Sequence, residues 1–296
     1  MQAALKSTIS AFDEMLAYET LWAMLNSSLK KIAEMFCEHK VLPSELLKIK
    51  SDMFDVPKLK EEVEKFLLNK RGFLVSINGD FQYPKRLRAA RYPIELFYYK
   101  GDVGLLDSPC ISVVGARKCT EKGIKRTMDL VKGLVKNDYT IVSGLASGID
   151  KVAMETAIAS KGNTIGVIGT PIDEYYPKEN KLLQDEISSK YLLMSQVPFY
   201  RYKKEPFSSK RNYFPQRNAT MSALSYATII VEASDTSGTL IQARECLAQN
   251  RKLFILNSCF ENSNISWPRK YEERGAKRVY ELDDILNVLN NGPTKK

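Results

Sequence analysis

The stretch Cys110-Ile-Ser-Val-Val-Gly-Ala-Arg-Lys118 decides the fold, because a run of small and apolar residues leads directly into a glycine and two cations. Five similar apolar runs follow, and most are separated by a stretch long enough for a helix. They are 140–142, 164–168, 191–194, 227–231 and 252–256. Apolar strands that alternate with helices form parallel sheets covered on both faces. The sequence therefore predicts an α/β fold with a doubly wound, mostly parallel sheet.

Three segments divide the chain. Residues 1–72 repeat apolar side chains at helical spacing, which predicts a small N-terminal helical domain. Residues 73–108 mix short apolar runs with turn residues, so we expect an extended connector that docks on the next domain. Residues 109–296 carry the alternation of strands and helices and form a Rossmann-like domain, which the amphipathic segment 282–289 caps.

The positive net charge of the chain indicates which kinds of molecule it is suited to bind. Lys and Arg number 44 against 35 Asp and Glu, which gives a formal net charge of +9. A basic surface favours nucleic acid or an anionic membrane, with solubility alone as the alternative explanation. No run approaches the ~20 apolar residues of a membrane-spanning helix, so we expect no membrane partner.

Cysteine and histidine usage argues against metal and hydrolytic chemistry. The five cysteines form no C-x-x-C pair, and their odd number argues against a disulfide framework. His39 is the only histidine, so we expect neither a histidine-pair metal site nor a serine triad. We predict no metal and no cofactor. Residues 1–10 show no basic stretch before an apolar run, which predicts a cytoplasmic protein without a secretory signal.

Three turns that follow predicted strands carry small and polar residues. The first holds Gly115, Arg117 and Lys118. Glycine lets the backbone approach a phosphate, and the planar guanidinium group of arginine can donate two hydrogen bonds to it. The turns at 143–150 and 232–239 place glycines and hydroxyl groups before a helix, whose free N–H groups attract anions. Because ligands of open parallel sheets bind beyond the carboxyl ends of the strands, we expect one cradle for a phosphate-bearing ligand.

Residues 200–218 interleave cations with aromatic rings. Lys210, Arg211, Phe214 and Arg217 belong to this segment. In proteins that bind single strands, cations follow the phosphates while rings stack on unpaired bases. The alternative is a solvated basic loop whose rings point inward, and composition alone leaves both interpretations open.

The motifs of nucleotide-dependent enzymes are missing. The sequence after 110–114 has no G-x-G-x-x-G, and the chain has no G-x-x-x-x-G-K-S/T loop. Gly144-Leu-Ala-Ser-Gly148 places its serine one position too late for a G-x-S-x-G nucleophile turn. We therefore expect no catalytic residues and no enzymatic activity.

Several segments together resemble the DprA/Smf family over roughly residues 75–260. They are Val113-Val-Gly-Ala-Arg-Lys118, Ile141-Val-Ser-Gly-Leu-Ala-Ser-Gly-Ile-Asp150, Tyr176-Pro-Lys-Glu-Asn180, Phe214-Pro-Gln-Arg-Asn218 and Ser237-Gly-Thr-Leu-Ile-Gln-Ala-Arg244. The resemblance implies a cytoplasmic homodimer that binds and protects single-stranded DNA. It further implies that the protein helps load a RecA-type recombinase in natural transformation and competence, or in related DNA processing and recombination.

The expected DNA-binding residues combine the family motifs with the basic segment. They are Gly115, Arg117, Lys118, Ser143, Gly144, Ser147, Gly148, Lys210, Arg211, Phe214, Arg217, Asn218, Ser237, Gly238 and Thr239.

The chain also departs from the family pattern. Met154 stands where the family usually has histidine, Ala219 replaces the second arginine of R-N-R, and Gln196 replaces the glutamate of S-E-Y-P. The chain ends too soon for the C-terminal winged-helix domain of many members, so we expect a divergent member that lacks it.

Two other functions remain as alternatives. One is a small-nucleotide sensor or nucleotide hydrolase of the same fold neighbourhood, including one that acts in phage defence. Ser237-Gly-Thr239 with Glu245 loosely resembles the P-G-G-x-G-T turn of nucleotide phosphoribohydrolases, without its double glycine. The other is an interaction protein that recruits a partner through its N-terminal helices.

Overall fold

A computed structural model describes residues 10–24, 28–51 and 55–290. Its strands form one sheet in the order β1-β2-β6-β5-β4-β3-β7-β8-β9. Their bounds are β1 (Leu74–Ile77), β2 (Leu96–Gly101), β3 (Cys110–Val114), β4 (Thr140–Ser143), β5 (Thr164–Ile168), β6 (Leu192–Ser195), β7 (Ala227–Ile230), β8 (Lys252–Leu256) and β9 (Lys277–Val279). Neighbours from β6 to β9 are parallel, whereas β2 pairs antiparallel with both β1 and β6.

The sheet is doubly wound about β3. The chain adds β4, β5 and β6 on one side of β3 and then returns to add β7, β8 and β9 on the other. Successive side chains of a strand point to opposite faces, and Ile111 and Val113 of β3 pack in one cluster with helices α6 (Glu121–Lys136), α7 (Ile149–Ala159) and α15 (Leu282–Asn290). Helices α11 (Tyr213–Leu224) and α12 (Thr239–Ala248) contribute to the cluster on the other face.

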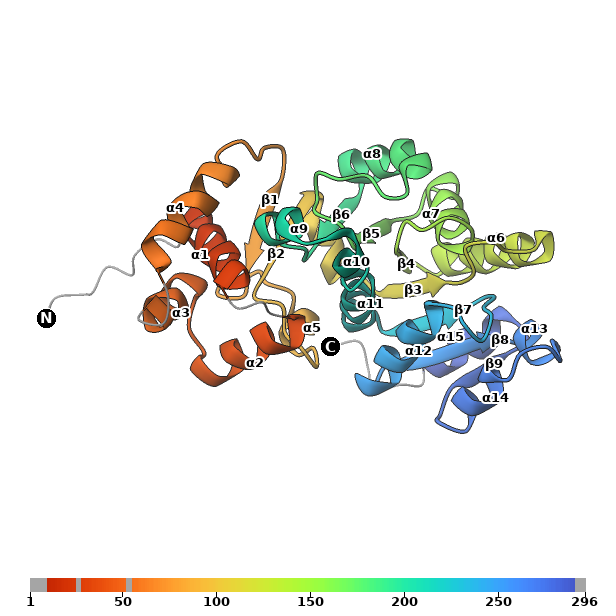
Figure 1. Ribbon diagram of the computed structural model, residues 1–296. Coiled ribbons are helices and arrows are strands. Elements are labelled where there is room, and N and C mark those ends of the chain that lie inside the picture. The colour runs from red at the N-terminus through yellow and green to blue at the C-terminus, as the bar shows by residue number, and fades with distance from the viewer. Residues whose placement is uncertain (1–9, 25–27, 52–54, 291–296) are drawn as a thin grey trace, which may run out of the picture.

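The helices of the first segment gather at one end of the molecule, beyond β1 and β2 (Figure 1). The helices of this first segment are α1 (Ala11–Met24), α2 (Leu29–His39), α3 (Pro43–Lys50) and α4 (Val56–Leu67). The others are α5 (Lys85–Arg88), α8 (Lys181–Lys190), α9 (Phe199–Lys204), α10 (Phe207–Lys210), α13 (Asn257–Phe260) and α14 (Trp267–Glu272), with 3-10 turns at Val103–Asp107 and Lys178–Asn180.

A buried carboxylate joins the first helix to the rest of the molecule. Glu19 of α1 accepts hydrogen bonds from the Tyr98 hydroxyl and from the backbone N–H groups of Phe199 (2.7 Å) and Tyr200 (2.9 Å). Burial raises the pKa of Glu19 to about 7, and the three donors oppose a larger rise. The N-terminal helices therefore share their core with β2 and α9.

The predicted fold class is confirmed, and the expected strands 110–114, 164–168 and 252–256 coincide with β3, β5 and β8. The segment 73–108 is more than a connector, because its two strands extend the sheet. β2 pairs with the edge that β6 would otherwise leave open, and β1 pairs with β2. The expectations for the first nine residues fall outside the described part of the chain. Within the described ranges, every helix is too short or too polar to cross a membrane.

Candidate nucleic-acid interface

A pocket of about 630 Å³ opens at the carboxyl ends of β3 and β7. This is the position where the winding of the sheet reverses direction, and the helices that follow the two strands diverge there. Its walls come from the turn after β3, the turn after β7 and the start of α11. Predicted site residues on its walls are Gly115, Arg117, Lys118, Phe214, Arg217, Asn218, Ser237, Gly238 and Thr239.

The turn after β3 presents an exposed guanidinium group. Arg117 makes no ion pair within the described residues, and its Cζ lies 6.0 Å from the centroid of the Phe214 ring. The backbone of this turn is held from both sides, because Ala116 donates to the Glu232 carbonyl (2.7 Å) and accepts from the N–H of Ile149 (3.1 Å). Arg117 is thus a solvated cation on a fixed backbone, beside an aromatic face.

The turn between β4 and α7 is closely packed around its glycines. A Cβ on Gly148 would lie 2.2 Å from the Ala116 carbonyl oxygen, and its φ of +76° is one that glycine adopts without strain. Leu145 also has a positive φ, +56°, and its carbonyl accepts a hydrogen bond from the Asn180 side chain (2.8 Å). The Ser143 hydroxyl points inward and donates to the Val113 carbonyl (2.7 Å).

The protein itself supplies the anion at this turn. Asp150, in the first turn of α7, is buried and accepts a hydrogen bond from the N–H of Gly144 (3.1 Å). Burial raises the pKa of Asp150, while the charge of Arg217 and the backbone donors act in the opposite direction. The N–H groups expected to bind a ligand phosphate are therefore partly used by an internal carboxylate.

Arg217 lies at the back of the pocket and is 6% exposed. Its Nη1 donates to the carbonyl oxygens of Gly144 (2.5 Å) and Val167 (3.0 Å). A Cβ on Gly144 would lie 1.9 Å from that Nη1, so a larger residue there would displace the guanidinium. Burial lowers the pKa of Arg217, and the nearby Asp150 charge raises it. Arg217 is therefore a buried side chain that links α11 to β5 and to the turn after β4.

The third turn completes the wall next to β3. The Thr239 hydroxyl donates to the Gly115 carbonyl (3.1 Å), and the Asn218 side chain donates to the Gly238 carbonyl (3.3 Å). Glu232, at the start of this turn, accepts from the backbone N–H (3.3 Å) and the hydroxyl (3.0 Å) of Thr120, the N-cap of α6. The start of α6 thus already has a carboxylate partner.

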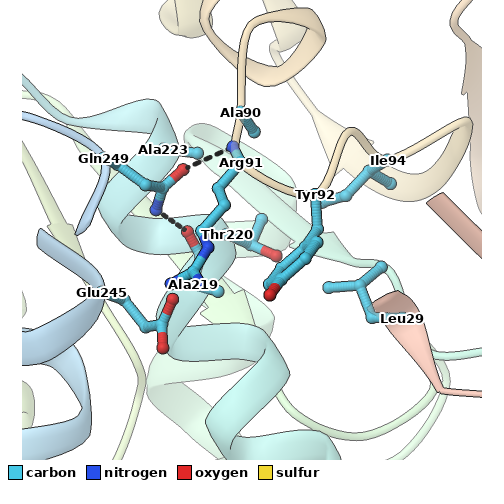
Figure 2. Close-up of a pocket in the computed structure, with 10 residues that line it drawn as sticks. All are labelled: Leu29, Ala90, Arg91, Tyr92, Ile94, Ala219, Thr220, Ala223, Glu245 and Gln249. Carbon is cyan, nitrogen blue, oxygen red and sulfur yellow. Dashed lines mark hydrogen bonds between the residues drawn. The ribbon is translucent and has the colours of Figure 1, made fainter. Parts of the chain in front are cut away.

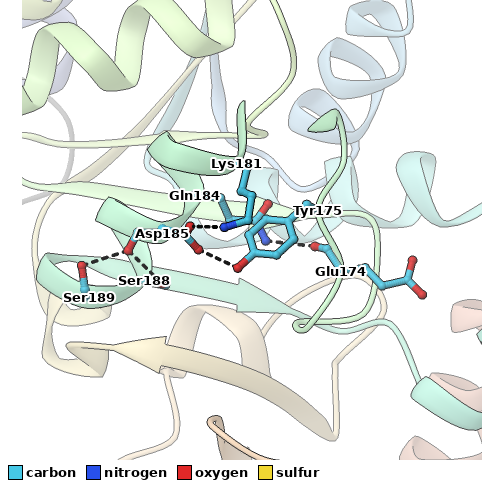
Figure 3. Close-up of polar contacts among 7 residues, drawn as sticks. All are labelled: Glu174, Tyr175, Lys181, Gln184, Asp185, Ser188 and Ser189. Atoms are coloured by element: carbon cyan, nitrogen blue, oxygen red, sulfur yellow. Dashed lines mark hydrogen bonds and ion pairs between the residues drawn. The ribbon is translucent and has the colours of Figure 1, made fainter. Parts of the chain in front are cut away.

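A polar clasp fixes the segment that leads into α8 (Figure 3). Asp185 accepts from the Tyr175 hydroxyl (2.6 Å) and from the Lys181 ammonium group (2.8 Å), and Gln184 donates to the Glu174 carbonyl (2.9 Å). The clasp holds the next residue, Tyr176, with its ring centroid 5.2 Å from that of Phe214. Two rings and the Arg117 guanidinium therefore form one continuous aromatic and cationic surface.

The model of the family described as DNA recombination-mediator protein A matches residues 74–290. The chain belongs to this family, that of the DprA and Smf proteins. It is 36% identical to DNA processing protein DprA of Streptococcus pneumoniae over 64% of this chain and 65% of the relative, and 32% identical to that of Bacillus subtilis over 80% of this chain and 82% of the relative.

Two solved DprA structures share the architecture. The crystal structure of DNA processing protein A from Streptococcus pneumoniae aligns with a TM-score of 0.77 at 28% identity and covers 95% of this chain and 98% of that chain. The Helicobacter pylori protein, whose structure describes a single-stranded DNA binding mode, aligns with a TM-score of 0.62 at 29% identity over 73% of this chain and 95% of its own.

Not every residue expected at the DprA-family site lines the pocket. Ser143, Gly144, Ser147 and Gly148 do not line it, although Ala146 and Asp150 of the same turn do. Two of the expected cations, Lys210 and Arg211, lie on the basic segment outside the pocket. The Lys210 ammonium group is 4.4 Å from the Tyr202 ring, and the Arg211 guanidinium is 5.9 Å from the Phe207 ring.

Some aromatic rings of segment 200–218 point inward and others are exposed, so neither the base-stacking nor the inward-pointing interpretation holds for all of them. Tyr200, Tyr202 and Tyr213 are buried, as expected for rings that point inward. Phe207 is 75% exposed, and Phe214 lines the pocket. Tyr176 was not predicted as a site residue, although it belongs to the motif Tyr176-Pro-Lys-Glu-Asn180 and is 44% exposed beside Phe214.

The departures from the DprA-family pattern lie in the interior or at its margin. Met154 and Gln196 are buried, at 0% and 1% exposed. Ala219 lines a cavity of only about 10 Å³, where Gln249 accepts from the Arg91 N–H (3.3 Å) and donates to the Ala219 carbonyl (3.0 Å) (Figure 2). None of the three lines the pocket at the carboxyl ends of β3 and β7, which we call the switch-point pocket. The described residues contain no group of three or more potential metal ligands.

Proposed function

We propose that the switch-point pocket binds single-stranded DNA, with Arg117 contacting a phosphate and the rings of Phe214 and Tyr176 stacking on bases. The observation that carries the proposal is the exposed Arg117 guanidinium against Phe214 on a backbone held at three points. Stacked rings recognise bases only when these are unpaired, and an arginine beside them pairs with the phosphates. The proposed site includes Gly115, Lys118, Asn218, Ser237, Gly238 and Thr239. The buried Arg217 and the turn residues Ser143, Gly144, Ser147 and Gly148 support its walls.

The wider role follows from membership of the DprA and Smf family. We propose that the protein acts in the cytoplasm as a homodimer that protects single strands and helps load a RecA-type recombinase, without catalysing a reaction of its own. Lys210 and Arg211 would extend the path of the strand beyond the pocket. The relatives' names, the family description and the Helicobacter pylori structure support this role.

A titration of labelled oligo-dT, with matched duplex alongside and at several salt concentrations, tests the binding proposal. We expect the single strand to bind more tightly than the duplex, because duplex bases cannot reach the rings. The logarithm of the association constant should fall with the logarithm of salt concentration, by about 0.7 for each phosphate neutralised. Equal affinity for duplex and single strand would mean nonspecific electrostatic attraction and would refute the stacking role.

A further inference from the structure

A second group of cations lies at the opposite edge of the sheet, where the parallel strands begin. Arg251 directly precedes β8, and Tyr226 directly precedes β7. The Arg86 guanidinium reaches the same edge and donates from Nη2 to the carbonyl oxygens of Leu106 and Ser108, both at 2.9 Å, just before β3. Three segments far apart in the sequence thus bring two arginines and a tyrosine together.

The guanidinium of Arg86 lies over the ring of Tyr226, and Arg251 lines the same groove. Arg86 Cζ lies 4.5 Å from the ring centroid. Burial lowers the pKa of Arg251, and the positive charge of Arg86 lowers it further. Both arginines line one groove, so their like charges repel each other.

No ion pair offsets this repulsion within the described residues. Neither Arg86 nor Arg251 forms an ion pair within the described ranges, although Asp107 lines the same groove. The Arg251 guanidinium donates from Nη2 to the Ala223 carbonyl (3.2 Å), but its Nε and the Nη1 of Arg86 are buried and have no hydrogen-bond partner among the described residues. A buried donor left unpaired is destabilising, and a bound anion would supply the missing partner after small side-chain adjustments.

The groove that contains these arginines is open and separate from the switch-point pocket. Its volume is about 1570 Å³, and it shares no lining residue with that pocket. Lys85 and Arg88 add positive charge to the groove. Four carboxylates also line it: Glu45, Asp80, Glu95 and Asp107. The ring of Phe81 is fully exposed at this groove, and that of Tyr226 is 38% exposed.

We propose that Arg86, Tyr226 and Arg251 form a second binding site, which takes a phosphate group at the amino ends of the strands. Two planar guanidinium groups match the oxygens of a phosphate in geometry and charge. The neighbouring exposed rings offer stacking surfaces to a base carried by that phosphate. The site is independent of the function proposed for the switch-point pocket.

Nuclear magnetic resonance of the arginine Nε–Hε groups tests the site in the unmodified protein. Inorganic phosphate is titrated against the ¹⁵N-labelled protein in place of chloride, at constant ionic strength. We expect a saturable shift of the Arg251 signal, because its guanidinium gains a partner. The signal of Arg274, an exposed arginine outside both pockets, should not saturate. An Arg251 signal that does not move, or that moves linearly like the Arg274 signal, would overturn the proposal.

Calorimetry on variants supplies the second test. In an Arg117→Ala background, which disables the switch-point pocket, Arg251→Gln should weaken phosphate binding about tenfold, the scale of one charged hydrogen bond. Arg274→Gln, with the same loss of charge, should leave binding unchanged. Arg251→Lys keeps the charge and serves if the glutamine variant fails to fold; it should still bind more weakly, because it loses the planar fork. Unchanged affinity in the folded Arg251 variants would contradict the site.

The same calorimetry identifies the source of the phosphate. Inorganic phosphate, dTMP and oligo-dT are compared as ligands of the Arg117→Ala protein. Tighter binding of oligo-dT assigns the site to a nucleic-acid strand, and tighter binding of dTMP assigns it to a free nucleotide. Equal affinities assign it to phosphate alone. If none of the three binds in an Arg251-dependent manner, the site does not exist.

Discussion

Arg117 and Arg217 carry the same charge and occupy the same pocket, yet their surroundings give them different tasks. Arg117 is exposed and makes no ion pair within the part of the chain that the structure describes. Arg217 is buried and donates to two backbone carbonyl groups. The first is therefore available to a ligand, whereas the second stabilises the wall behind it.

Arg117→Ala should weaken the binding of oligo-dT by about 1–3 kcal/mol, or roughly 5- to 150-fold in Kd, because one charged contact is lost. Fluorescence anisotropy with labelled oligo-dT measures the change. The free energy of unfolding should stay within about 0.5 kcal/mol of the parent, as for other exposed positions. Arg274→Ala is the matched control, and equal Kd values for the two variants would remove Arg117 from the site.

Arg217→Ala should lower the free energy of unfolding by about 3–5 kcal/mol, because it leaves the buried Asp150 without its compensating charge. Urea unfolding measures this change. Adding Asp150→Asn to the variant should recover part of the loss, since the uncompensated carboxylate is then gone. A loss below about 1 kcal/mol would mean that Arg217 acts on the ligand rather than on the fold.

At the scale of elements, the turn between β4 and α7 depends on a segment that comes much later in the chain. Asn180, at the end of a 3-10 turn, donates to the carbonyl of Leu145, whose positive φ is unfavourable for a branched side chain. The clasp around Asp185 fixes the segment that carries Asn180. The shape of the pocket floor is thus set by the start of α8 as well as by its own glycines.

Asn180→Ala should loosen this turn without unfolding the sheet. Loss of one side-chain hydrogen bond, worth about 1 kcal/mol, should speed local hydrogen exchange of the amides in 143–148 by about fivefold. Ser189→Ala, which removes an exposed hydroxyl from α8, is the control. Unchanged exchange in the turn would show that the glycines alone hold it.

The sequence predicted those elements whose signal is local. β3 and β5 are buried along their whole length and β8 is buried at its centre, and such apolar runs predict their own bounds. The place of β1 and β2 in the sheet was missed, because their pairing depends on the free edge of β6, far along the chain. The burial of Arg217 was missed too, because its partners are backbone carbonyl groups, which leave no trace in side-chain patterns.

At the scale of the whole molecule, Glu19 makes stability depend on pH. Its pKa is about 7 in the folded protein against an ordinary value of 4.5, so between these values the native state binds more protons than the unfolded one. The stability that Glu19 contributes therefore falls as pH rises from 4.5 towards 7, and then levels off. The total change amounts to about 3 kcal/mol.

Glu19→Gln should remove this dependence, because glutamine does not titrate. Urea unfolding of both proteins from pH 5 to pH 8 measures it. We expect the parent to lose stability relative to the variant across this range, whatever the absolute effect of the lost acceptor oxygen. Parallel pH profiles would show that Glu19 is ionised throughout.

The antiparallel pairing of β2 with β6 also bears on how the chain folds as it is synthesised. Gly101 leaves the ribosome long before its partner Leu192 exists, so β2 emerges with one edge open. The backbone N–H groups that Glu19 requires arrive later still, at Phe199 and Tyr200. The N-terminal helices therefore cannot complete their core during early translation, and we expect them to fold cooperatively with the parallel part of the sheet rather than as an independent unit.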